Sequence, residues 1–213
     1  MKLSASRRSS LLQKAEQFAG NLGEQATSYL LSRGISREVA EMFSFGYVPY
    51  GEENGGRLSI PYITPAGCVQ IKYRCISVEH GDHKGVDCPK YLFEAGLGVH
   101  LYNARILIHA PELVVVTEGE LDAAVVQAYT GIPAVGYPGV DTWAQQKHWP
   151  LCFEGVGDIA VVADGDKAGK DSANRVAGSI PGARVVTLGG GHKDANEFIA
   201  ALGASAFMER VNR

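Results

Sequence analysis

The chain has 213 residues, of which 46% are hydrophobic and 20% are charged, a balance typical of a globular protein that excludes a disordered or fibrous one. Its apolar runs are far shorter than the roughly 20 residues that span a bilayer, and the polar start MKLSASRRSS lacks the apolar core of a signal peptide. We therefore expect a cytoplasmic protein. The net charge of −3 is uneven, because residues 111–213 hold eight Lys and Arg against thirteen Asp and Glu.

The first third of the chain predicts helices followed by strands. Apolar residues recur at steps of three or four, which predicts one amphipathic helix that ends near Gly34: Leu11, Ala15, Phe18, Leu22, Ala26 and Tyr29. Ser36 is a candidate cap for a short helix through REVAEMF. The stretches RLSIPYI and CVQIKYRC predict strands, and the alternation of apolar and polar residues in the second predicts a half-buried antiparallel ribbon.

The stretch CISVEHGDHKGVDC contains side chains that can bind a metal, namely Cys75, His80, His83 and Cys88. Their spacing matches no common zinc finger, because structural zinc sites usually have tighter ligand pairs. The stretch is also typical of a polar hairpin loop. The spacing therefore disfavours zinc, and the four cysteines, none in a CxxC pair, predict no disulfide framework.

From residue 112 the pattern changes to apolar strands that alternate with helical segments. The predicted strands are LVVVT, IPAVG, DIAVVA and ARVVTL, and the helices between and after them are LDAAVVQAY, TWAQQKHW, KAGKDSANRVAGSI and ANEFIAAL. Strands that are apolar throughout indicate a parallel sheet covered on both faces. We therefore predict an α/β protein with two domains, residues 1–110 and 111–213.

Acidic residues follow three of these strands. Glu118 follows the first, Asp164 and Asp166 follow the third, and Asp194 follows the fourth. The carboxyl ends of parallel strands meet at one edge of a sheet, where carboxylates would repel one another unless a cation compensated them. Oxygen ligands, with only His192 nearby in sequence, favour Mg²⁺ or Mn²⁺.

The segment after Asp164 is suited to holding phosphate. Gly165 allows a backbone or a phosphate to approach closely, and a helix that starts near Ala168 directs its positive end to the same place. Lys167 and Lys170 add positive charge. An alternative is that Asp166 and Asp194 are only helix caps, the commoner role for a single Asp at such a position, although capping alone does not explain acids after three strands.

Three segments resemble the motifs of the Toprim fold, which DnaG-type primases share with topoisomerases and some nucleases: VVVTEGELDAAVV, IAVVADGDKAGKDSANRV and GGGHKDANEFI. The last block is similar to the primase half of phage primase-helicases, whereas cellular enzymes more often have an acid where this chain has Asn196. Earlier segments resemble the small mixed subdomain of the primase core, namely ATSYLLSRGISREVAEMFSFGYVP, GGRLSIPYITPAGCVQIKYRCIS and CPKYLFEAG. The resemblance covers roughly residues 25–200.

This resemblance implies a Toprim-type parallel sheet flanked by helices, preceded by a small α+β subdomain. It implies a DNA primase core, in which two or more Mg²⁺ or Mn²⁺ ions held by acidic residues promote nucleotidyl transfer from NTPs onto RNA primers on single-stranded DNA. The implied ligands are Glu118, Asp164, Asp166 and Asp194, with Glu118 as a ligand or as the general base.

The resemblance also implies that Arg57, Arg74 and Lys90 bind template or nucleotide and that Tyr91 stacks on a base. Read from the residues alone, the commoner role of such basic side chains is that of a solvated surface charge, and the commoner role of Tyr91 is that of an anchor in the core. Both interpretations stay open at this point.

We expect partners as well, because the resembling primases usually carry a zinc module and a helicase or helicase-binding domain. The implied partners are a replicative helicase, a separate zinc-binding or template-recognition protein, or both, in a phage or a mobile element. Two other functions share the fold: a small Toprim nuclease and a DNA-binding recombination module, the latter usually without the acids. A topoisomerase is disfavoured, because its nucleophilic tyrosine normally lies in a further domain.

Overall fold

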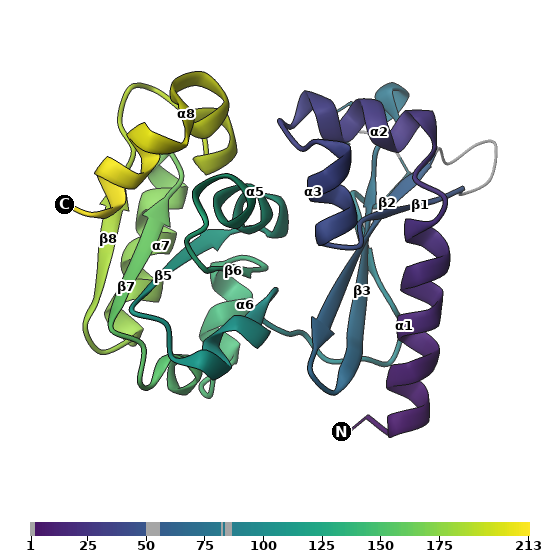
Figure 1. The fold of residues 1–213 in the computed structure, drawn as a ribbon, viewed down its shortest axis with the longest axis horizontal. Coiled ribbons are helices and arrows are strands. Elements are labelled where there is room, and N and C mark those ends of the chain that lie inside the picture. The colour runs from purple at the N-terminus through teal and green to yellow at the C-terminus, as the bar shows by residue number, and fades with distance from the viewer. Residues whose placement is uncertain (1–2, 50–55, 82, 84–86) are drawn as a thin grey trace. The chain divides into compact units, whose positions relative to one another are not determined.

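The computed structural model describes residues 3–49, 56–81, 83 and 87–213. Two compact units make up the chain, Met1–His100 and Leu101–Arg213, each with its own sheet (Figure 1). The boundary precedes the change of sequence pattern near Ala110. Residues 101–110 belong to the second unit, where the N–H of Tyr102 donates to the carbonyl oxygen of Gly136 at 2.8 Å.

The helices of the first unit are α1 (Ala5–Ala19), α2 (Gly23–Ser32) and α3 (Arg37–Met42). The prediction of one helix ending near Gly34 is wrong, because the chain leaves the helix at Gly20 and re-enters it at Gly23, which has a φ of 62°. The sequence suggested a single helix because α1 and α2 each bury an apolar side, so the spacing of apolar residues continues from one helix into the next. The predicted cap of α3 is confirmed: the Ser36 hydroxyl accepts a hydrogen bond from the N–H of Val39 at 3.4 Å.

The sheet of the first unit is antiparallel, in the order β1 (Gly46–Val48), β2 (Arg57–Thr64), β3 (Gly67–Cys75) and β4 (Tyr91–Phe93), with the short 3₁₀ helix η1 (Val78–His80) between β3 and β4. Helix α1 packs on one face, where Leu11 and Ala15 meet Cys68 and Ile71. The predicted antiparallel pairing is confirmed, because β2 and β3 are antiparallel neighbours in this sheet. Two polar residues of β3, Gln70 and Lys72, are more buried than expected. The side-chain oxygen of Gln70 accepts hydrogen bonds from the backbone N–H groups of Ile71 and Glu94.

The sheet of the second unit is parallel throughout, in the order β6-β5-β7-β8. Its strands are β5 (Leu113–Glu118), β6 (Ala134–Tyr137), β7 (Asp158–Ala163) and β8 (Ala183–Thr187). The central strands β5 and β7 are buried along most of their length because helices cover both faces. The predicted fold class is confirmed.

The helices of this unit are α5 (Glu120–Thr130), α6 (Val140–Gln145), α7 (Lys167–Ser179) and α8 (Ala195–Val211, kinked at Gly203), with the 3₁₀ helices η2 (Ala104–His109) and η3 (Pro150–Phe153). Helix α5 packs against α8, and α6 packs against α7. Since right-handed crossovers in opposite directions place their helices on opposite faces, the two pairs cover the two faces of the sheet. Within the described residues, no helix is long and apolar enough to cross a membrane.

In the first unit, the close contact between α1 and β1 can be tested by substitution. A Cβ at Gly46 would lie 2.2 Å from the backbone carbonyl carbon of Phe18 at the end of α1. We expect Gly46→Ala to lower the free energy of unfolding by roughly 1–3 kcal/mol, because backbone must move to admit the methyl group. Urea denaturation of the full chain measures this.

The matched control is Gly20→Ala, at the end of the same helix, where the nearest atom would lie 3.6 Å away. This substitution should change the stability by no more than about 0.5 kcal/mol. Equal stability of the two variants would show that α1 and β1 do not pack as described.

Candidate functional site

Glu118 ends strand β5 and is held by the neighbouring strand. In the parallel register it lies opposite Tyr137, whose hydroxyl donates a hydrogen bond to Oε2 of Glu118 at 3.4 Å and also lies 2.9 Å from Oγ of Ser172 on α7. Burial raises the pKa of Tyr137 well above its ordinary value, so this hydroxyl stays protonated and able to donate. Gly119 follows with a φ of 132°, a conformation that favours glycine at this sharp turn into α5.

Asp164 and Asp166 lie in the short turn between β7 and α7. Asp164 directly follows the strand, and Asp166 caps the helix by accepting a hydrogen bond from the N–H of Gly169 at 2.7 Å. Gly165 between them donates its N–H to the carbonyl oxygen of Lys193 at 2.7 Å, and a Cβ there would lie 2.2 Å from the carbonyl oxygen of His192. The close approach that Gly165 permits is therefore to the protein's own backbone.

The same hydrogen bond brings the start of α8 to this edge. Asp194 is buried and caps α8, accepting a hydrogen bond from the N–H of Glu197 at 2.8 Å. Next to it, the backbone N–H of Asn196 donates to Oδ1 of Asp122 at 3.0 Å. Capping is thus confirmed for Asp166 and Asp194. A cap uses one oxygen of a carboxylate, which has two, so capping and metal binding are compatible.

Asp122 is a residue of this edge that the sequence analysis did not identify. It lies in the first turn of α5 and is buried. The available signal was its position four residues after Glu118, since the first turn of a helix that follows a parallel strand stays at the carboxyl edge of the sheet. Tyr137 was also missed, although the strand register places it opposite Glu118.

These carboxylates act electrostatically on one another, and we name them the acidic edge: Glu118, Asp122, Asp164, Asp166 and Asp194. Burial and the negative charges of the other members together raise the pKa of Asp164 to about 7. Burial is the largest cause, followed by the charges of Asp122, Glu118, Asp194 and Asp166 in that order. Acids from two strand ends and three helix starts thus lie close enough together to oppose ionisation of Asp164.

The donor set of the acidic edge fits a hard divalent cation. Carboxylate oxygens are the ligands that Mg²⁺ and Mn²⁺ prefer, and a cation would relieve the repulsion that raises the pKa of Asp164. The four acids singled out from the sequence all belong to this edge, and Asp122 is a fifth member.

A cavity of about 300 Å³ adjoins Asp164. Its other lining residues include Lys170, Thr187, Leu188, Gly189, Gly191 and His192. Lys167, the first residue of α7, is exposed and is not among the lining residues. The structure thus places one of the two predicted phosphate-binding lysines beside the carboxylate and the other on the adjoining surface.

In the first unit, basic side chains surround Tyr91 on the paired strands β3 and β4. Arg74 lies opposite Tyr91 in the register and donates a hydrogen bond from Nη1 to its hydroxyl at 2.8 Å, while Lys72 lies opposite Phe93. The Nζ atoms of Lys72 and Lys90 lie 4.2 and 5.7 Å from the centroid of the Tyr91 ring. We call this set the basic–aromatic face: Lys72, Arg74, Lys90, Tyr91 and Phe93.

Tyr91 is not an anchor of the core, because 36% of its surface is exposed. Arg57 differs from the other predicted contacts, because it is only 1% exposed. Its Nη1 atom donates to the carbonyl oxygen of Pro89 at 2.9 Å, and its Nη2 atom to Sγ of Cys88 at 3.1 Å. Its guanidinium is therefore engaged inside the unit, where template or nucleotide would not reach it without a rearrangement.

The chain is similar to a phage protein and to bacterial DNA primases, although no family model matches it. The gene 57 protein of Mycobacterium phage D29 is 33% identical over 161 residues, which cover 73% of this chain and 98% of that protein. The DNA primase of Salmonella typhimurium is 26% identical over 184 residues, which cover 70% of this chain and 31% of the primase. The chain thus spans about a third of the length of that curated primase.

Solved primase structures share the fold. A DnaG primase catalytic domain bound to single-stranded DNA superposes with a TM-score of 0.70 at 23% identity, over 98% of this chain and 80% of that one. The primase fragment of the bacteriophage T7 primase-helicase gives a TM-score of 0.66 at 22% identity, over 90% and 79%. Because the curated relatives and the fold agree with the sequence motifs, the chain belongs to the Toprim-fold family of DnaG-type primases.

Proposed function

We propose that this protein is a DNA primase core that synthesises short RNA primers on single-stranded DNA by metal-dependent nucleotidyl transfer. The observation that carries the proposal is the acidic edge, in which the pKa of Asp164 is raised to about 7 by burial and by the other carboxylates. Such a concentration of charge disfavours the metal-free ionised state and is typical of a functional site. The similarity to curated DNA primases supports this reaction class.

In the proposed reaction, a primer 3′-hydroxyl attacks the α-phosphate of an NTP and pyrophosphate leaves. Glu118, Asp164 and Asp166 would hold two or more Mg²⁺ or Mn²⁺ ions, together with Asp122 and Asp194. When bound, such ions lower the pKa of the attacking hydroxyl, offset phosphate charge and orient the reacting oxygens in line.

Side chains of the protein itself would position the reacting groups and bind the phosphates. Tyr137 positions Glu118 through the hydrogen bond to Oε2, so that this carboxylate is a ligand or accepts the proton of the attacking hydroxyl. Lys170, which lines the cavity beside Asp164, would contact the phosphates, with Lys167 adding positive charge nearby. The N-terminus of α7 adds a favourable field for the same anion.

The basic–aromatic face is our candidate for template contact. Exposed aromatic rings next to cations bind single strands by stacking on bases while the cations attract the backbone, and Tyr91 with Arg74 and Lys90 has this composition. Lys72 is only 6% exposed, and its Nζ atom lies against the Tyr91 ring. A solved relative of the same fold binds single-stranded DNA. We further propose a replicative helicase or a template-recognition protein as a partner, since another relative is part of a primase-helicase.

Asp164 provides a test of the metal site by stability. Its pKa of about 7 in the folded state lies above the ordinary value of 3.8, so the folded state binds the extra proton and the stability of the metal-free protein falls as the pH rises between these two values. Above pH 7 the penalty is fully present. We expect Asp164→Asn to raise the Tm of the metal-free protein at pH 8 by roughly 2–4 °C, a shift of about 1 kcal/mol after allowance for solvent screening.

The difference should shrink as the pH is lowered toward 4, because the wild-type carboxyl is then protonated in the folded state and becomes protonated in the unfolded state as well. Mg²⁺ should raise the Tm of the wild-type protein at pH 8 and have a smaller effect on the variant. If Mg²⁺ stabilised both proteins equally, Asp164 would not belong to the ion site.

Activity is tested with single-stranded DNA, labelled NTPs and Mg²⁺ or Mn²⁺. We expect short labelled oligoribonucleotides, and a rate lowered roughly 10²–10³-fold by Asp164→Ala, because loss of a metal ligand removes several kcal/mol of transition-state stabilisation. Asp158→Asn is the matched control. It changes an acid at the other end of the same strand, where the carboxylate pairs with Arg184, and should leave the rate close to that of the wild type.

Shortened DNA without incorporation of NTPs would instead identify a nuclease. An unchanged rate in Asp164→Ala would refute the site itself.

Template contact is tested by the affinity for labelled single-stranded DNA. Tyr91→Ala should weaken binding roughly tenfold, since a base stacked on an aromatic ring contributes ~1–3 kcal/mol. Tyr129→Ala, which removes an exposed tyrosine of α5, should leave the affinity unchanged. Equal affinities of the two variants, both with wild-type circular dichroism, would exclude stacking on Tyr91.

A further inference from the structure

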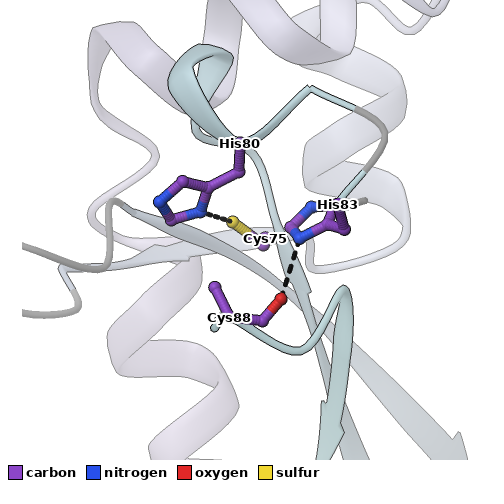
Figure 2. Close-up of side chains that lie close together, drawn as sticks. All are labelled: Cys75, His80, His83 and Cys88. Carbon is purple, nitrogen blue, oxygen red and sulfur yellow. Dashed lines mark hydrogen bonds between the residues drawn. The ribbon is translucent and has the colours of Figure 1, made fainter. Parts of the chain in front are cut away.

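A cluster of metal-ligand side chains lies in the first unit, separate in sequence from the acidic edge. Cys75, His80, His83 and Cys88 each offer one ligand atom, and these atoms all lie within 4.8 Å of one another. Figure 2 shows the four side chains converging between the end of β3 and the segment that leads into β4. The proposed primase chemistry uses none of them.

The fold brings these residues together despite their loose spacing. Cys75 is the last residue of β3 and His80 is the last residue of η1, so a short turn directs the imidazole back towards the cysteine. The distance between Sγ of Cys75 and Nδ1 of His80 is 3.2 Å. Cys88 comes from the return of the chain toward β4, and the N–H of Cys75 donates to the carbonyl oxygen of Lys90 at 2.9 Å, which aligns the two segments.

His83 is oriented by a backbone hydrogen bond. Its Nδ1 atom lies 2.9 Å from the carbonyl oxygen of Cys88, the contact drawn in Figure 2. A carbonyl only accepts, so Nδ1 carries the proton and Nε2 keeps its lone pair. Metal-binding histidines almost always use their second nitrogen in this way, because the bond fixes both the tautomer and the direction of the ring.

The charge and the burial of the cluster also fit a metal. Cys75 and Cys88 are 5% and 4% exposed, and Nη2 of Arg57 donates to Sγ of Cys88 at 3.1 Å. The positive charge of this guanidinium lies beside the cluster and would offset part of the negative charge that two metal-bound thiolates bring. Zinc sites have Zn–S and Zn–N bonds of about 2.3 and 2.0–2.1 Å, which put ligand atoms about 3.3–3.8 Å apart. The widest pair would have to close by about an ångström.

We propose that Cys75, His80, His83 and Cys88 bind a structural zinc ion that ties the end of β3 to the start of β4. Two thiolates and two imidazoles form the tetrahedral set that selects zinc among the common divalent ions, and four protein ligands leave no open position for catalysis. The argument from spacing against zinc fails here because strand pairing, and not the sequence separation of the ligands, closes the site. Such an ion would stabilise the β3–β4 pairing that carries Arg74 and Tyr91.

The test is the metal content of the full chain, produced in zinc-containing medium under reducing conditions and measured by plasma mass spectrometry. We expect about one zinc ion per chain in the wild type and loss of this zinc in Cys75→Ser and in Cys88→Ser. Two matched controls, Cys152→Ser and His148→Asn, change an exposed cysteine and an exposed histidine of the second unit and should keep the full zinc content.

A spectroscopic measurement on the wild type avoids the possibility that a variant fails to fold. After removal of the zinc, Co²⁺ should produce the intense visible bands of tetrahedral coordination and a thiolate-to-cobalt charge-transfer band, and zinc should abolish both. Absence of bound zinc together with absence of these bands would overturn the proposal. So would unchanged zinc in both cysteine variants, or a Cys75–Cys88 disulfide in the reduced, zinc-supplied protein.

The proposed zinc site and the proposed role of the acidic edge can be refuted separately. Asp164→Ala should lose primer synthesis and keep its zinc, whereas the cysteine variants should lose zinc and still show the stabilisation by Mg²⁺ if the second unit folds. A protein that contains zinc but makes no primers would refute only the proposed function.

Discussion

Repulsion among carboxylates that converge at one edge of the sheet is the constraint on which the second unit depends. Parallel strands direct their carboxyl ends to one edge, and the helices that follow begin there, so acids at strand ends and in first helical turns converge. The convergence is unfavourable in the absence of a cation, as the raised pKa of Asp164 shows. A protein keeps such an arrangement when the charge is used, and here the charge can be used to hold divalent ions.

Several hydrogen bonds hold these acids in place in spite of their repulsion. Each one satisfies a backbone or hydroxyl donor, such as the N–H of Gly169 on Asp166 or the hydroxyl of Tyr137 on Glu118. Gly165 ties the turn after β7 to the segment before α8 through a contact that leaves no room for a side chain. The site is therefore organised by the same bonds that begin the helices, which gives rigidity without a separate scaffold.

The first unit has a different constraint, because it must keep the short edge strand β4 paired with β3. This pairing brings the basic residues of the basic–aromatic face close together. Strand β4 has three residues, and pairing of that length is weak by itself. Arg57, buried at the start of β2, donates hydrogen bonds to both Pro89 and Cys88. The cysteine and histidine cluster connects the end of β3 to the same segment before β4. A metal at this place would provide the stability that the few backbone hydrogen bonds do not.

The sequence by itself determined the parallel sheet and the set of acids at its edge, because strand ends and their order follow from hydrophobic periodicity and from the direction of the chain. It also determined the cap of α3, which depends on residues three apart. Only the tertiary structure decided that Asp122 joins the acids, that Arg57 is buried, and that Cys75 and Cys88 meet two histidines. The physical reason is that these contacts form between segments brought together by packing and strand pairing, so the distances between the side chains do not follow from the separation of the residues along the chain.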